Sequence, residues 1–309
     1  PVRERVQVVP ARKLPSKLGQ EEFLRVHLGR VGERIVATPL KRGAGAITSL
    51  TRADGIVRIP SSSEGIAEDG SVTAELLRPR SAVERTLVVV GSHDVTLDLM
   101  ADHIRSHSPD IHVSASNVGS LAGLVALRDG RSHLGGTHLL DQETGGYNVS
   151  WVQKILGARP VKLVTLAYRE QGLIVARGNP KKIEHLGDLT RREVVFVNRQ
   201  SGAGTRVLLD HELQKLSIDP SGIAGYDNEE FTHMAVAVQV LGGKADAGMG
   251  IRAAAVALDL DFLPVTTERY DLCIPLQFED DPRIRALMKT LRSHSFRREV
   301  ESLGGYDVT

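Results

Sequence analysis

Four short segments of the sequence place glycine together with serine or threonine where an apolar run ends. Backbone N–H groups at the start of a helix have no internal partner and carry the positive end of the helix dipole. Glycine lets the backbone approach a ligand closely, and hydroxyl groups add donors, so such turns favour anions. The four segments are Val90–Ser92, Asn117–Ser120, Gly135–His138 and Asn198–Arg206.

Residues of these segments that offer a backbone or hydroxyl donor are the predicted anion ligands. Several such turns at the carboxyl ends of parallel strands can converge on one ion. An arginine of the last segment, Arg199 or Arg206, could add charge, although a structural ion pair is an equally good interpretation. The predicted ligands are Ser92, Ser120, Thr137, Ser201, Gly202, Gly204, Thr205 and Arg206.

Two simpler interpretations of these residues stay open at this point. Ser92 and Ser120, each taken alone, fit as helix N-caps. Thr137 and His138, taken alone, fit as loop residues whose polar atoms are satisfied by solvent. The anion site is therefore predicted from the conjunction of the four segments, since no single residue requires it.

Other motifs of catalysis and metal binding are missing or incomplete. Val207 stands where a dinucleotide-binding motif needs its third glycine, and the sequence contains neither a P-loop nor a nucleophile elbow. Cys273 is the only cysteine, so neither a disulfide within the chain nor a cysteine zinc cage can form. We therefore predict no catalytic residue and no metal ligand in the chain as given.

From residue 86 onward, the elements that must position these turns alternate between strand and helix. Thr86–Gly91 is a continuous apolar run, which is typical of a buried parallel strand. Val95–Ser106 and Ser120–Asp129 carry apolar residues at helical spacing. This alternation predicts an α/β domain with a mostly parallel sheet. Two extended stretches, 163–176 and 265–277, could carry the chain from one lobe to another and back.

The preceding residues have a different pattern. Short apolar runs separated by turn clusters predict a small all-β barrel. This part has a net charge of +5 and the rest a net charge of −4, which together give the +1 of the chain. We therefore predict a barrel over 1–80 and a two-lobed domain over 81–309, with lobe 1 at 81–165 and 275–309 and lobe 2 at 166–274.

The composition of the 309 residues limits the class of function. Apolar residues make up 41% and charged residues 25%, as in globular domains. Near-zero net charge and only 4% aromatic residues argue against a nucleic-acid surface. No apolar run approaches the roughly 20 residues of a membrane span. The first residue is Pro1, so we expect a chain whose preceding part is missing.

Residues 163–275 resemble the type II periplasmic-binding-protein superfamily, in particular its branch related to molybdate and tungstate binders and to LysR-type effector domains. The order and spacing of the matching segments carry this resemblance, which extends more weakly back to residue 86 and forward to the chain end. It implies a fold of two lobes that close on a ligand. The matching segments are Gly172–Pro180, Val195–Asp210, Ala245–Gly250 and Glu268–Asp271.

Residues 5–78 resemble the C-terminal β-barrel domain of the molybdopterin molybdotransferase family (MoeA, gephyrin). Ala44, between Gly43 and Gly45, departs from the family's pattern and removes a hydroxyl that could bind an oxyanion. The resemblance implies that a catalytic, pterin-binding domain precedes the barrel and shares a site with Ser16, Lys17 and Arg25. Alternatively, the first two of these cap a turn and the arginine pairs with an acid. The matching segments are Arg12–Gly19, Glu22–Val26 and Leu50–Gly55.

Together the resemblances imply the C-terminal part of a molybdenum-cofactor biosynthesis protein in the cytoplasm. The two-lobed domain would bind molybdate or tungstate, without a tightly bound cofactor, while molybdopterin would bind the parent protein. Expected partners are the missing N-terminal molybdotransferase domains and, as an open alternative, a second copy of the chain. Two other functions stay open. One is a LysR-like sensor of a small organic anion, and the other is a catalytic role for the barrel in the parent's metal transfer.

Overall fold

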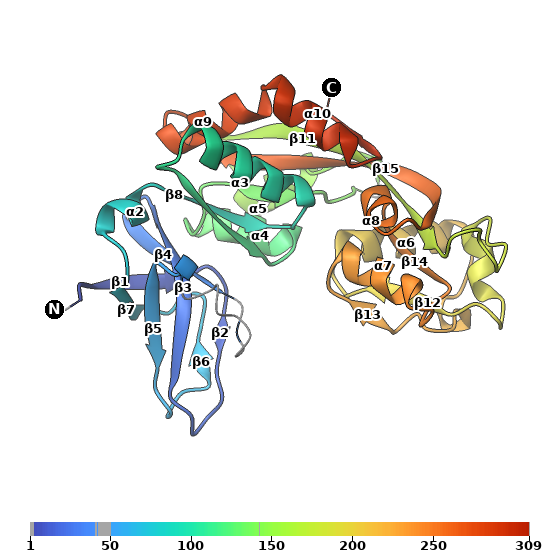
Figure 1. Cartoon of the computed structure of the whole chain (residues 1–309), viewed down its shortest axis with the longest axis horizontal. Coiled ribbons are helices and arrows are strands. Elements are labelled where there is room, and N and C mark those ends of the chain that lie inside the picture. The colour runs from blue at the N-terminus through green and yellow to red at the C-terminus, as the bar shows by residue number, and fades with distance from the viewer. Residues whose placement is uncertain (1–2, 41, 43–50, 142, 309) are drawn as a thin grey trace. The chain divides into compact units, whose positions relative to one another are not determined.

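The computed structural model describes residues 3–40, 42, 51–141 and 143–308 (Figure 1). The segment Gly43–Gly45 of the barrel resemblance lies outside the described residues. The chain divides into two compact units, each built from discontinuous segments. Unit 1 contains Pro1–Thr137, Val152–Val164 and Leu272–Phe296, and unit 2 contains His138–Trp151, Thr165–Asp271 and Arg297–Thr309.

The first part of unit 1 is a closed five-stranded barrel, blue in Figure 1. β1 pairs in parallel with β4, and the other neighbours pair antiparallel. Buried and exposed residues alternate along the first strand, as expected when one face lies against a core. In barrel order, the strands are β1 (Arg5–Pro10), β4 (Arg34–Pro39), β3 (Glu22–Val31), β5 (Gly55–Ile59) and β7 (Val72–Leu76).

Apolar side chains from all five strands fill the barrel core, for example Val26, Leu28 and Val57, each fully buried. A separate two-stranded ribbon pairs β2 (Leu14–Pro15) with β6 (Gly65–Ile66). The predicted barrel is therefore confirmed.

The rest of unit 1 alternates strand and helix. β8 lies parallel to β9 and is fully buried along its length, which explains its continuous apolar sequence. The helix α4 packs against both β8 and β10. The elements are α2 (Arg80–Glu84), β8 (Thr86–Gly91), α3 (Val95–His107), β9 (His112–Asn117), α4 (Ser120–Arg128), β10 (Gly135–Thr137), η3 (Leu276–Phe278) and α9 (Pro282–Leu291).

Unit 2 is built on a mixed sheet. Its strand order is β15-β11-β14-β12-β13 with the short β16 paired to β11, and β10 of unit 1 continues the order beside β15. β12 pairs in parallel with β13 and β14, whereas β11 pairs antiparallel with β14. The strands are β11 (Val161–Val175), β12 (Phe196–Arg199), β13 (Glu229–Glu230), β14 (Ala247–Ile251), β15 (Asp261–Pro275) and β16 (Tyr306–Asp307).

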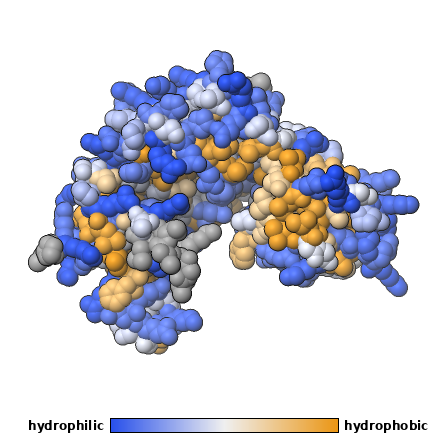
Figure 2. Space-filling model, in the orientation of Figure 1, coloured by the Kyte–Doolittle hydropathy of each residue, from blue (hydrophilic) through white to orange (hydrophobic). Residues whose placement is uncertain are grey.

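Three helices accompany this sheet, together with two short 3₁₀ turns. The helices are α6 (Gly204–Lys215), α7 (His233–Leu241) and α8 (Arg252–Ala257), and the turns are η1 (Leu186–Thr190) and η2 (Pro220–Gly222). Two further helices, α5 (Val149–Leu156) and α10 (His294–Ser302), have some of their residues in each unit. Figure 2 shows apolar side chains gathered over α7 and α8, where Met234, Val238 and Leu241 are exposed.

The predicted fold class is confirmed, with a small all-β barrel followed by an α/β part. The two predicted crossing stretches are the long strands β11 and β15, whose residues belong partly to each unit. The predicted boundary at residue 80 falls inside unit 1, and the division into domains stays a prediction. Among the described residues, no helix combines the length and hydropathy that a membrane span requires.

Candidate functional site

The anion-binding turns predicted in unit 1 lie at one edge of its parallel strands. β8 pairs with β9 on one side and forms a parallel bridge to Leu134, just before β10, on the other. At the carboxyl ends, the Ser92 N–H donates to the Gly136 carbonyl (2.9 Å) and the Gly119 N–H donates to the Gly91 carbonyl (3.2 Å). The structure thus brings three of the predicted turns together, those that carry Ser92, Ser120 and Thr137.

The interpretation of the two serines as helix caps is wrong. Asp94 caps α3, because its side chain accepts a hydrogen bond from the Thr96 N–H at 2.8 Å. Gly119 occupies the N-cap of α4, and Ser120 is the first residue inside that helix, 6% exposed. Residues other than Ser92 and Ser120 therefore occupy the N-caps of α3 and α4, and helix capping does not account for these two serines.

The predicted loop of unit 2 leads from β12 into α6. Ser201 and Gly202 are exposed, and the N-cap of α6 is Ala203, whose side chain cannot accept a capping bond. Thr205 is only 1% exposed, and its Oγ1 lies 3.1 Å from the Gln171 Nε2 that donates to it. The Ser201 N–H at the loop tip donates to Glu229 Oε1 (3.0 Å), so a carboxylate already occupies this backbone donor, and the threonine hydroxyl faces the interior of the unit.

Both arginines of this loop make structural contacts. Arg206 Nε lies 3.3 Å from Asp210 Oδ1, and Arg206 Nη1 lies 3.6 Å from Glu229 Oε1. Its guanidinium also stacks on Tyr226, 3.9 Å from the ring centre. Arg199 donates through Nη2 to the Phe231 carbonyl (3.1 Å). Carboxylates thus compete with any anion for Arg206, and its role as a ligand stays a prediction.

A buried polar network lies beneath the loop and centres on Glu268, which is 1% exposed. Its Oε1 accepts hydrogen bonds from Arg169 Nε and from Gln171 Nε2, the latter at 2.7 Å. Its Oε2 lies 3.1 Å from His138 Nδ1. A buried carboxylate needs such partners, because an unpaired charge in the interior is costly.

The network keeps Glu268 ionised. Burial alone would raise its pKa, but the attraction of Arg169 and His138, with hydrogen bonds from His138 and Gln171, outweighs burial and lowers the pKa to about 2. Burial and repulsion from Arg169 lower the pKa of Arg199 to about 10. A carboxylate held in this way is a poor proton donor near neutral pH, so we assign it to positioning its neighbours.

His138 connects this network to the anion loop. A Cβ placed on Gly204 would lie 2.2 Å from His138 Cε1, so the first residue of α6 must lack a side chain. Thr137 is fully buried and His138 is 5% exposed, which contradicts their interpretation as solvated loop residues. The histidine is held by Glu268 from one side and touches the helix start on the other.

Sequence reasoning missed the network, although one signal was present. Arg169 and Gln171 alternate along β11, and Glu268 and Tyr270 alternate along β15, next to apolar stretches. Residues two apart share one face of a strand, so polar side chains at such positions in a buried strand must find each other. Their pairing across the sheet required the strand order, which the sequence did not reveal.

In the barrel, Ser16 Oγ donates to Glu22 Oε2 (2.9 Å), which supports a structural role. Lys17 is exposed and Arg25 is half-buried on β3. Within the described part of the chain, Arg25 forms no ion pair with a carboxylate, so the interpretation of Arg25 as one half of an ion pair is wrong. Whether these three residues serve a shared site with another domain stays a prediction.

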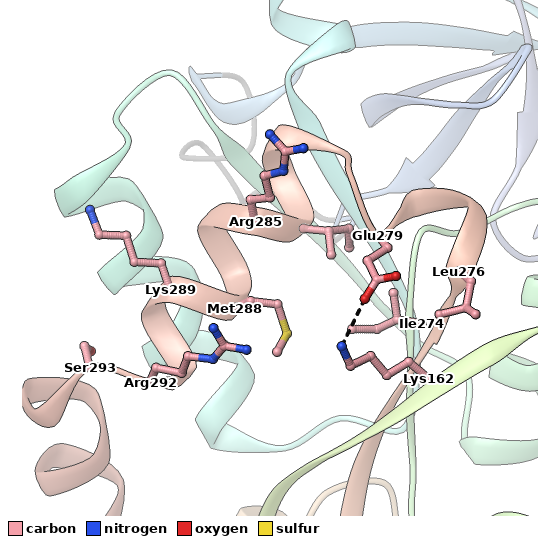
Figure 3. Close-up of a pocket in the computed structure, with 10 residues that line it drawn as sticks. Lys162, Ile274, Leu276, Glu279, Arg285, Met288, Lys289, Arg292 and Ser293 are labelled. Atoms are coloured by element: carbon pink, nitrogen blue, oxygen red, sulfur yellow. Dashed lines mark hydrogen bonds and ion pairs between the residues drawn. The ribbon is translucent and has the colours of Figure 1, made fainter.

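Unit 1 also contains a pocket of about 610 Å³ between α9 and the ends of the long strands (Figure 3). Its floor is apolar, with Ile274, Ile284 and Met288. In Figure 3, Lys162 bonds to Glu279 at the side of the pocket opposite α9, with 3.1 Å between Nζ and Oε1. None of the predicted anion ligands lines it. Its volume lies within the range of pockets for small organic ligands.

Comparison with known protein families identifies the α/β part. A family model described as the PBP superfamily domain matches residues 101–292. The chain belongs to the PBP superfamily. A second family model, the MoeA C-terminal region (domain IV), matches residues 7–77 and covers the barrel. The PBP superfamily chain described here therefore carries a MoeA-type barrel in front of its α/β domain.

Two relatives and two solved structures are similar to this PBP superfamily chain. The uncharacterised protein YvgK of Bacillus subtilis (strain 168) is 34% identical over 224 residues, 72% of each chain. An uncharacterised protein encoded in the 5′ region of a 2Fe-2S ferredoxin gene of Clostridium pasteurianum is 39% identical over 104 residues, 33% of this chain and 92% of that protein.

Among solved structures, a putative phosphate ABC transporter substrate-binding protein with bound phosphate from Clostridium perfringens has a TM-score of 0.53 at 16% identity. It covers 71% of this chain and 97% of its own. The effector-binding domain of a BenM variant has a TM-score of 0.51 at 16% identity, over 72% of this chain and 99% of that one. At these identities the likeness shows the fold alone.

Proposed function

We propose that the α/β part of this chain binds a tetrahedral oxyanion, molybdate or tungstate, and serves molybdenum-cofactor assembly. The MoeA-type barrel supports the link to molybdenum, and the phosphate bound to a protein of the same fold supports an oxyanion ligand. Proposed donors on unit 1 are Ser92, Ser120 and Thr137, and those on unit 2 are Ser201, Gly202, Gly204 and Thr205.

The observation that carries the proposal is the meeting of three turns at one edge of unit 1. Backbone bonds from Ser92 to Gly136 and from Gly119 to Gly91 fix these turns against each other. A tetrahedral dianion can be held by several such neutral donors, because hydrogen bonds to a charged group are stronger than those between neutral groups. Among the described residues, no group of three or more carboxylates, histidines and cysteines suits a metal cation.

Calorimetric titration of the chain with molybdate, tungstate, sulfate and phosphate tests this proposal. We expect binding of molybdate or tungstate, and a loss of about tenfold or more in affinity for Ser120→Ala, since one hydrogen bond to a charged ligand is worth roughly 1.5–3 kcal/mol. Ser221→Ala, on the exposed turn η2, is the matched control. If none of the four ions produces heat, the proposal fails.

A second candidate function is the binding of a small organic anion. The pocket beside α9 supports it, because an apolar floor with Met288 and cations such as Arg285 and Arg292 at its rim suit an apolar body with a carboxylate. Benzoate is the probe. Met288→Glu should abolish benzoate binding detected by NMR, whereas Met234→Glu, at an exposed methionine of α7, should preserve it. Binding of benzoate to both variants with equal affinity would exclude this pocket.

A further inference from the structure

A second cavity of unit 1, about 290 Å³, lies where the barrel meets α3 and β9. Three arginines and two histidines line it and come from five separate parts of the chain. His27 lies on β3, Arg52 just before β5, Arg78 after β7, Arg105 on α3 and His112 on β9. None of the ligands predicted from sequence lines this cavity.

Acidic partners do not balance this charge. On the barrel side of the cavity, the acidic lining residue is Asp54. Its carboxylate lies 3.3 Å from Arg78 Nε and 3.0 Å from His27 Nδ1. On the other side, Asp102 lies 2.6 Å from Arg105 Nη2. Three arginines thus face two carboxylates, and the described residues offer no ion pair to Arg52. The cavity therefore has a net positive charge even with both histidines neutral.

A buried hydroxyl points to a missing partner in the same cavity. Ser114, on β9, is 1% exposed and lines the cavity. Within the part of the chain that the structure describes, its Oγ makes no hydrogen bond. An unsatisfied buried polar group costs roughly 1–3 kcal/mol, and an acceptor oxygen on a ligand would remove that cost.

Ala101, Ile111 and Val113 form an apolar wall, and Thr86 also lines the cavity, with its hydroxyl donating to the Ala82 carbonyl. The volume lies close to the lower end of the range of about 300–1,000 Å³ for organic ligands. Arginine forks match the oxygen geometry of phosphate, and a dianion suits an excess of positive charge. From this combination, we propose that the cavity binds a small phosphate monoester, with the phosphate among the cations and the organic part on the apolar wall.

Titration of the whole chain with phenyl phosphate, followed by ³¹P NMR and calorimetry, tests this inference. The double variant Arg52→Ala/His112→Ala should weaken binding by about tenfold or more, because Arg52 supplies a charge and His112 a ring donor, and neither has an acidic partner among the described residues. The control double variant Arg58→Ala/His107→Ala removes one exposed arginine from the barrel and one exposed histidine from α3, and should bind as the parent chain does. Equal affinity of the parent chain and the first double variant would overturn the inference.

Ser114→Ala separates binding from folding. The substitution should weaken phenyl phosphate binding severalfold while leaving the unfolding transition unchanged or slightly raised, since the hydroxyl is unsatisfied in the free chain. A loss of stability with unchanged affinity would show that the hydroxyl has a structural partner, and would contradict the inference.

Two further titrations test which ligand binds and at which site it binds. Phenyl phosphate should bind at least about tenfold more tightly than inorganic phosphate, because the ring buries apolar area. Equal affinity would overturn the assignment to an ester. Ser120→Ala and Thr205→Val, at the proposed oxyanion site, should leave phenyl phosphate binding unchanged. If they abolish it, the ester binds at that other site, and this inference fails while the proposed function stands.

Discussion

At the scale of single residues, Glu268 is the centre of a buried polar network in unit 2. Its carboxylate compensates Arg169, which is fully buried, and orients Gln171 and His138 beneath the loop of α6. Removing one partner of a buried pair leaves the other charge unpaired, and this typically costs 3–5 kcal/mol. The network thus links the stability of unit 2 to the placement of the proposed anion donors.

We predict that Glu268→Gln lowers the free energy of unfolding of unit 2 by about 3–5 kcal/mol. Molybdate affinity should fall as well, because His138 loses the partner that holds it against Gly204. Urea denaturation monitored by Trp151, the only tryptophan, checks the first effect. Glu279→Gln, in an exposed pair with Lys162, is the matched control and should change stability by less than about 1 kcal/mol.

His133 is the residue whose titration should limit stability in mild acid. Its Nδ1 accepts a hydrogen bond from the Val88 N–H (2.9 Å), which requires that nitrogen to be unprotonated. Burial, together with repulsion from Arg283, lowers the pKa of His133 to about 3. Between pH 6.5 and 3 the unfolded chain therefore binds a proton at this ring that the folded chain does not, and stability falls as pH falls.

For His133→Gln, which keeps an acceptor for Val88, we predict a weaker dependence on pH. From pH 7.5 to 5.0, the parent chain should lose about 2 kcal/mol more stability than the variant, since each pH unit of differential protonation is worth about 1.4 kcal/mol. Urea denaturation followed by circular dichroism at both pH values measures the difference. His107→Gln, at an exposed ring, should follow the parent chain, and a parallel pH dependence of all three would refute the assignment.

At the scale of elements, apolar spacing predicted where the helices of unit 1 begin. It did not predict how closely these helices pack on the strands. α3 and α4 begin at Val95 and Ser120, as the sequence pattern predicts, because helical periodicity is a local property. The long strands β11 and β15 were predicted only as extended stretches, and the polar network between them was not predicted. Their pairing depends on contacts between distant segments, which one sequence does not display.

Gly123 shows how a non-local contact overrides local propensity. In a helix, Gly→Ala ordinarily stabilises by about 1 kcal/mol. A Cβ at Gly123 would lie 2.6 Å from Gly91 Cα and 2.8 Å from the Val90 carbonyl, and neither backbone atom can move cheaply. The glycine therefore lets α4, and with it Ser120, lie directly on β8.

We predict that Gly123→Ala destabilises unit 1 and weakens molybdate binding, because α4 must move away from β8. Ala122→Gly, at the exposed neighbouring position, should cost about 1 kcal/mol by propensity alone and leave binding unchanged. Thermal unfolding and calorimetry compare the two variants. A gain in stability for Gly123→Ala would show that α4 does not pack as closely as described.

Two valines of α7 provide a matched test of burial. Val236 is fully buried in a cluster with Val197 and Val240, whereas Val238 is 50% exposed. We predict that Val236→Ala lowers the unfolding free energy by about 2 kcal/mol and that Val238→Ala changes it by less than about 0.5 kcal/mol. Denaturation curves of both variants measure this, and equal losses would indicate that something covers the exposed face.

At the scale of the whole molecule, two arginines bond the barrel to the rest of unit 1, the partly buried Arg283 and the buried Arg131. Arg283, at the start of α9, donates through Nη1 to the carbonyls of Arg30 in β3 (2.9 Å) and Thr86 in β8 (3.0 Å). Arg131 donates to the Ala11 carbonyl of the barrel (3.1 Å). Because these acceptors are backbone carbonyls, no pattern of residue types in the sequence could predict the pairing.

We therefore expect that, when these bonds are removed, the barrel strands and the α/β strands of unit 1 lose their protection from amide hydrogen exchange together. We predict that Arg283→Ala raises amide hydrogen exchange about tenfold or more in both β3 and β8, because hydrogen bonds to a charged group are worth roughly 1.5–3 kcal/mol each. Arg285→Ala, on the same helix and paired with Asp280 at the surface, is the control and should leave both strands protected. The amides of α7, in unit 2, should be unaffected in either variant and serve as an internal reference. Faster exchange confined to α9 would mean that the barrel is held to β8 by its apolar contacts without help from the guanidinium.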